Sequence, residues 1–207
     1  HIRDLETFIE DLRHKSLFFS EPSKELKILL NSLSKDLCRK IPKGMEWFRA
    51  RRHQSTLSPP TAPYGSQEIG APPKAMVSTG RLNSEGISFL YLASNYRLAQ
   101  LEVRSIRGAW STIGTFKAAR EQTVFYTSHI PDDYSSEEME FIIYLDQKMA
   151  VPSEGKVIET RFTRWMAEYL LHKQGIENFI YSCSIAPNYR INDRNICSIV
   201  PDAWDVT

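Results

Sequence analysis

The apolar residues at the start of the chain recur at the spacing of an amphipathic helix. Two such sets stand within residues 1–43, and Ser20-Glu21-Pro22 between them is typical of a helix start. We interpret this segment as two helices placed before a main domain of residues 44–207. The helices either pad the core, which we favour, or offer a docking surface to a partner. Their apolar positions are Ile2, Leu5, Phe8, Ile9 and Leu12, then Leu26, Leu29, Leu30, Leu33 and Leu37.

From residue 44 onward, short apolar strands are interspersed with helices in no regular repeat. This order predicts an α+β fold with a central mixed sheet, flanking helices and the N-terminal helical appendage. Ser135 and Glu138 form a capping box for one helix, and Gly175 fits the C-terminal cap of another. The predicted strands cover residues 45–50, 87–93, 110–116, 123–126, 179–185 and 195–200, and further helices are predicted to begin near residues 95, 135 and 159.

The stretch from residue 80 to residue 104 combines a turn, a strand and a helix that carries a carboxylate. Strand alternation places Tyr91 on one face, with Phe89 and Ala93, and Leu90 and Leu92 on the other. Ser94 or Asn95 caps the helix that follows, whose apolar seam is Leu98, Leu101 and Ile106, with Glu102 beside it. A strand that delivers a phenol and a helix that delivers a carboxylate can frame one site.

Composition narrows the functional classes. The formal net charge of +1 gives no general attraction to nucleic acid or to a membrane surface, and the apolar runs are too short to cross a bilayer. The three cysteines lack C-x-x-C spacing, which favours a reduced, cytoplasmic protein without a metal site. No signal peptide is recognised, and a first residue of His1 leaves room for a longer natural chain.

Five short motifs then occur in one order over residues 45–207, and together they resemble the RES domain family. The resemblance implies a fold similar to the ADP-ribosyltransferases and an enzyme that degrades NAD by phosphorolysis or hydrolysis. It also implies a toxin of a toxin–antitoxin or defence system, with an antitoxin protein as partner. The motifs are Phe48-Arg49, Gly80-Arg81-Leu82-Asn83, Tyr91, Leu101-Glu102-Val103-Arg104 and Tyr181-Ser182.

The resemblance assigns the catalytic positions to Arg49, Tyr91 and Glu102. A guanidinium makes two charge-assisted bonds to a phosphate at once, and an aromatic face attracts a charged nicotinamide ring. A carboxylate stabilises the oxocarbenium character that develops when a bond at an anomeric carbon breaks. NAD is therefore the expected substrate, inorganic phosphate is a candidate co-substrate, and no other cofactor or metal is expected.

Three further contacts with the substrate are expected, for which there are four candidate residues. Arg81 and Asn83 lie in a glycine-flanked turn whose exposed amides suit an anion. The third residue is a serine near Tyr181; Ser182 and Ser184 share one strand face, so either one fits. Neither serine has a His and an Asp at recognisable spacing, so we expect the hydroxyl to bind substrate rather than attack it.

Several alternatives stay open at this stage. The enzyme could transfer ADP-ribose to a protein, or the chain could be a non-catalytic sensor that binds a nucleotide. Tyr91 could be an ordinary core aromatic, and Glu102 with Arg104 a solvent-facing charge pair. The proline-rich segment 56–74 is either a lid or a passive connector. RNA binding is disfavoured by the charge balance, and the oligomeric state is open, a homo-oligomer included.

Overall fold

The computed structural model describes residues 2–15, 20–54, 58–104, 108–127, 134–150, 160–183 and 193–207. Its centre is one eight-stranded sheet in the order β1-β5-β6-β7-β3-β2-β4-β8. Neighbouring strands are antiparallel except for the parallel pair β5–β6, which confirms the expected mixed sheet. The strands are β1 Cys38–Ile41, β2 Glu46–Arg52, β3 Leu90–Ala93, β4 Ser111–Ala118, β5 Gln122–Tyr126, β6 Asn178–Ser182, β7 Arg194–Ser198 and β8 Trp204–Val206.

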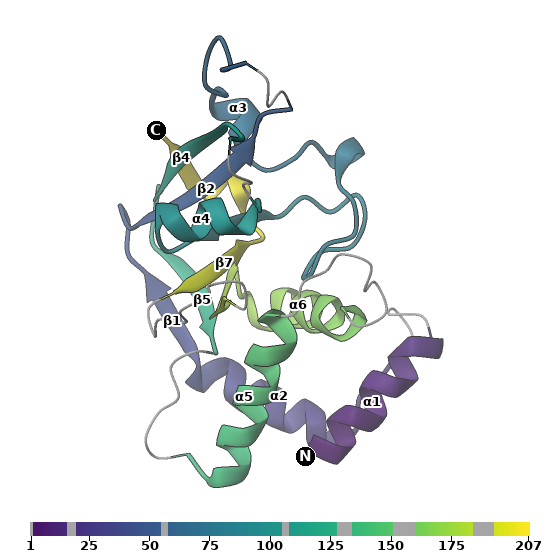
Figure 1. Ribbon diagram of the computed structural model, residues 1–207. Coiled ribbons are helices and arrows are strands. Elements are labelled where there is room, and N and C mark those ends of the chain that lie inside the picture. The colour runs from purple at the N-terminus through teal and green to yellow at the C-terminus, as the bar shows by residue number, and fades with distance from the viewer. Residues whose placement is uncertain are drawn as a thin grey trace.

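Helices α1, α2, α5 and α6 gather around one end of the sheet, while α4 crosses it near β2 and α3 lies at the far end (Figure 1). The predicted caps are present. Asn95 Oδ1 accepts from the amide of Leu98 at 2.9 Å to start α4, and Ser135 Oγ accepts from the amide of Glu138 at 3.2 Å. Gly175 ends α6 with a φ of 64°. The helices are α1 Ile2–His14, α2 Lys24–Asp36, α3 Ser66–Ile69, α4 Tyr96–Glu102, α5 Ser136–Ala150 and α6 Arg161–Gln174, with short 3₁₀ helices at Lys74–Met76 and Pro201–Ala203.

Alternate residues of the central strands face two separate apolar clusters. Tyr91 and Phe179 pack with the cluster that α1, α2, α5 and α6 cover. Leu90, Leu92 and Ile180 belong to a second cluster on the opposite face. The alternation predicted for the strand around Tyr91 is therefore confirmed, and it determines which face carries the phenol.

The N-terminal helices contribute directly to the first of these clusters. Leu5 and Leu12 of α1 and Leu30 of α2 are almost fully buried in it. Strand β1, which the sequence pattern did not predict, pairs with β5 at the edge of the sheet. The proposed boundary at residues 43 and 44 stays a prediction.

Several elements are shorter than expected. Strand β3 covers only four residues, and α4 ends at Glu102 because Val103 forms its C-terminal cap. Leu101 is 38 % exposed, so the predicted apolar seam of α4 does not extend to it, and Ile106 lies outside the described residues. Short elements of this kind carry weak periodicity, and for that reason the pattern overestimated them.

The sheet is open between its central strands β2 and β3. Strand β2 pairs with β4 through seven residues but with β3 through the single pair Phe48 and Ala93. If the antiparallel register continued, Ala50 would lie opposite Tyr91. The two strands separate there instead, which leaves backbone groups of β3 available to side chains.

Within the described ranges, none of the helices combines the length and the apolar composition needed to cross a membrane.

We predict that the N-terminal helices and the sheet unfold as one unit. Leu30→Ala removes a side chain that is 1 % exposed and should cost about 2–5 kcal/mol, because it leaves a cavity in the shared core. Ile28, on the same helix, is 60 % exposed, so Ile28→Ala should change stability by about 0.5 kcal/mol at most.

Urea unfolding followed by tryptophan fluorescence tests this prediction, because all four tryptophans lie beyond residue 43. An unchanged fluorescence midpoint in a folded Leu30→Ala variant would mean that α2 is an independent appendage.

Candidate functional site

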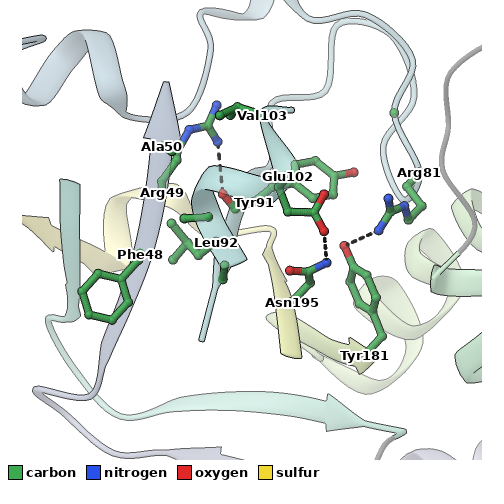
Figure 2. Close-up of a pocket in the computed structure, with 13 residues that line it drawn as sticks. Phe48, Arg49, Ala50, Arg81, Tyr91, Leu92, Glu102, Val103, Tyr181 and Asn195 are labelled. Carbon is green, nitrogen blue, oxygen red and sulfur yellow. Dashed lines mark hydrogen bonds between the residues drawn. The ribbon is translucent and has the colours of Figure 1, made fainter. Parts of the chain in front are cut away.

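A cavity of about 270 Å³ lies where β2 and β3 separate. It is bounded by β2, by the turn before β3, by β3 itself, by the end of α4 and by β6 and β7 (Figure 2). Four of the residues expected from the sequence line it, namely Arg49, Arg81, Tyr91 and Glu102. They come from four separate segments of the chain, so the fold alone brings them together.

Arg49 bridges the opening between the two strands. Its Nη1 donates to the backbone carbonyl of Tyr91 at 3.3 Å, which replaces the missing ladder bond. Burial, together with the charge of Arg51, lowers the pKa of Arg49 to about 10. The group stays charged at neutral pH, but its Nε is buried and has no partner among the described residues. A desolvated guanidinium with unused donors favours an anionic ligand.

Arg81 sits on the opposite side of the cavity against Tyr181. Its Nη1 donates to the Tyr181 hydroxyl at 3.3 Å, and its Cζ lies 5.4 Å from the centre of that ring. Burial opposes the charge, but Tyr181 and Glu102 more than offset it, so the pKa of Arg81 is raised. From α6, Thr163 Oγ1 donates to the Arg81 carbonyl at 2.5 Å and holds the turn in place.

The Tyr91 hydroxyl is fixed by the turn that precedes its own strand. It donates to Asn83 Oδ1 at 2.8 Å and accepts from the amide of Leu82 at 3.1 Å. Burial raises the pKa of Tyr91 well above its usual value, so the phenol is neutral. Asn83 is 4 % exposed, and its Nδ2 donates to the carbonyls of Ser78 and Ser84 at 3.1 Å each. Asn83 therefore holds the Tyr91 hydroxyl in place through this hydrogen bond.

Glu102, the last residue of α4, points toward β7 and the end of β6. Asn195 Nδ2 donates to its Oε1 at 2.5 Å, and Cys183 Sγ lies 3.3 Å from the same oxygen. The interpretation of Glu102 as a solvent-facing charge is wrong, because these contacts hold it in the cavity wall. An acidic side chain here gives the site one negative group between two cationic ones.

Of the two serines expected near Tyr181, only Ser182 belongs to the described residues. Ser182 does not line the cavity, and its amide donates to Asp146 Oδ1 at 3.0 Å. The alternation of β6 turns Tyr181 and Cys183 toward the site instead. Ser184 lies outside the described residues.

Tyr181 and Asn195 line the cavity although the sequence did not assign them to the site, and Cys183 and Thr163 contact residues that line it. Strand alternation placed Cys183 opposite Ser182, but nothing local indicated which face would meet the site. Thr163 opens α6, where a contact with a turn 82 residues away leaves no local signal. No described residue of the segment 58–74 lines the cavity.

A family model described as the RES domain matches residues 46–206. The chain belongs to the RES domain family. Every cavity residue named above lies within the matched range, so the site is a feature of the RES domain. The search of curated proteins found no match.

Among solved structures, this RES domain chain is similar to a chain in the crystal structure of the M. tuberculosis MbcT–MbcA toxin–antitoxin complex. The two are 13 % identical, with a TM-score of 0.48, and the match covers 86 % of this chain and 89 % of the other.

We predict that the turn before β3 tolerates no side chain at Gly80. A Cβ there would collide with Asn83 Oδ1 and would lie 3.1 Å from the Tyr91 hydroxyl oxygen. Gly80→Ala should therefore cost about 1–3 kcal/mol and displace the phenol. Gly65→Ala is the matched control, since its Cβ would meet only Glu68 Oε2 at 3.6 Å.

Thermal unfolding of the two variants measures the difference. Equal melting temperatures for Gly80→Ala and the native chain would show that the close packing around Asn83 is dispensable.

Proposed function

We propose that the protein is an NAD-degrading enzyme that breaks the bond between nicotinamide and its ribose. The observation that carries this proposal is the convergence of Arg49, Arg81, Tyr91 and Glu102 on one cavity. These groups match the parts of NAD in kind: two cations for a pyrophosphate, an aromatic face for a planar cation, and a carboxylate for a reacting sugar. Membership in the RES domain family supports the same substrate.

The arginines supply the anion-binding part of the proposed site. Among the described residues, neither Arg49 nor Arg81 forms an ion pair with a carboxylate. Burial lowers the pKa of Arg49, so a bound pyrophosphate would recover part of the cost of burying that charge. For Arg81, in contrast, Tyr181 and Glu102 already offset the burial. Each guanidinium donates one hydrogen bond through Nη1 and has a buried Nε without a partner among the described residues. Because the burial of Arg49 is not offset in this way, Arg49 is the stronger candidate for this contact.

The phenol and the carboxylate supply the part that acts on the nicotinamide riboside. The ring of Tyr91 would pack on the nicotinamide or its ribose, because its hydroxyl is already held by Asn83 and Leu82. Glu102 would orient the ribose and stabilise positive charge at the anomeric carbon. A fixed negative charge close to an oxocarbenium ion lowers the barrier without forming a bond to it.

The proposed reaction balances with either of two acceptors. The carbon–nitrogen bond breaks, and its electron pair stays with the nicotinamide nitrogen, which becomes neutral. An oxygen of hydrogen phosphate then bonds to the anomeric carbon and gives ADP-ribose 1″-phosphate. With water as acceptor the product is ADP-ribose, and the water proton passes to solvent.

An enzyme that removes NAD would harm the cell that makes it. We therefore also propose that the protein acts as a toxin and that an antitoxin protein covers or blocks it. This part of the proposal rests on the family alone.

One assay separates the candidate activities. The native chain is incubated with NAD labelled in the adenosine part, with and without phosphate, and free nicotinamide is measured. Phosphate-dependent release indicates phosphorolysis, phosphate-independent release with free ADP-ribose indicates hydrolysis, and label bound to protein indicates ADP-ribosyl transfer. Saturable NAD binding with no nicotinamide release would contradict an enzymatic function and indicate a non-catalytic sensor.

We predict that Glu102→Gln separates binding from turnover. The amide keeps the size of the side chain and still offers an oxygen to Asn195, but it lacks the charge that stabilises the cation. Nicotinamide release should fall by about a hundredfold or more, while the dissociation constant for NAD, measured by calorimetry, should change by about threefold at most.

Glu140→Gln, at an exposed position on α5, is the matched control and should leave both quantities unchanged. Complete loss of NAD binding by Glu102→Gln, or turnover at the native rate, would contradict the proposed role of Glu102 in stabilising the sugar cation.

A further inference from the structure

The carboxylate of Glu102 is held through one of its two oxygens. Asn195 Nδ2 donates to Oε1 at 2.5 Å, and Cys183 Sγ donates to the same oxygen at 3.3 Å. A carboxylate only accepts, so the nitrogen of the Asn195 amide must be the atom that faces it. As far as the described residues go, Oε2 is the oxygen left for a ligand.

Asn195 is anchored far more firmly than Glu102. It lies in β7, between β3 and β6, opposite Ala93 on one side and Tyr181 on the other, and is 4 % exposed. Glu102 stands at the C-terminal end of α4, where the helix dipole disfavours negative charge. Figure 2 shows the amide of this strand residue directed at the carboxylate of the helix residue.

Stability alone does not explain an asparagine at this position. Its Oδ1 is buried and has no hydrogen-bond partner among the described residues. An unpaired buried acceptor costs about 1–3 kcal/mol, a cost that a leucine of similar shape would avoid. Of the two polar atoms of the amide, the nitrogen is the one that is bonded, and its partner is Glu102.

We propose that Asn195 is a positioning residue that fixes Glu102 Oε1 and thereby aims Oε2 at the reacting ribose. The catalytic consequence rests on the function proposed above, in which Glu102 stabilises the sugar cation. The geometric part, that Asn195 determines the place of the Glu102 carboxylate, does not depend on that function.

Asn195→Leu tests the role with nearly unchanged side-chain shape. The variant removes the bond to Glu102 and also the unpaired Oδ1, and because these two effects oppose each other, its melting temperature should change little. If it cleaves NAD, kcat should fall by about tenfold to a hundredfold because the carboxylate is misplaced, with little change in KM. A structural role would instead lower the melting temperature.

Asn195→Asp tests the donor itself through pH. When the introduced carboxyl group is protonated it donates to Glu102, as the amide does, and when both groups are charged they repel. The activity of this variant relative to the native chain should therefore be highest at acidic pH and fall as the pH rises. A constant ratio across the pH range would contradict a role as donor.

Crystal structures of the native chain and of Asn195→Leu decide the geometric part even if neither protein releases nicotinamide. The proposal expects the Glu102 carboxylate of the variant to leave its native place by about 1 Å or more. A carboxylate that stays in place, beside Cys183, overturns the proposal. Absence of nicotinamide release from the native chain would overturn the proposed function and leave this result standing.

Discussion

The site depends on the separation of two central strands that share one residue pair. Beyond the pair of Phe48 and Ala93, β2 continues to pair with β4, and β3 continues to pair with β7. The carbonyl of Tyr91 then faces the guanidinium of Arg49 in place of a strand. A buried carbonyl requires a hydrogen-bond donor. Arg49 supplies this donor at the position where the two strands separate. The cavity is the space between the separated strands β2 and β3.

Around this opening, rigid elements hold each polar group. The turn at Gly80–Asn83 fixes the Tyr91 hydroxyl, and α6 fixes the turn through Thr163. Strand β7 holds Glu102 by way of Asn195. The apolar clusters on both faces of the sheet support these strands, including the cluster to which α1 and α2 contribute. A site built in this way is preorganised before any ligand arrives, which is the condition for electrostatic stabilisation of a transition state.

Local patterns predicted those parts of the fold that depend on local physics. Alternation placed Tyr91 and Leu90 on opposite faces of β3, and Asn95, one of the two expected caps, starts α4. Motif order gave Arg49, Arg81, Tyr91 and Glu102, all of which line the cavity. Ser182 is not among the residues that line the cavity, since the period of a strand gives two faces without indicating which one meets the site.

Other features leave no local trace. The opening between β2 and β3, the edge strand β1 and the contact of Asn195 with Glu102 arise from segments distant in sequence.

The most direct test of the central claim is a crystal structure of Glu102→Gln soaked with NAD. The account predicts an intact dinucleotide with its pyrophosphate at Arg49 and its nicotinamide ribose between Tyr91 and position 102. NAD bound away from this cavity, or a cavity that stays empty at saturating NAD, would contradict it.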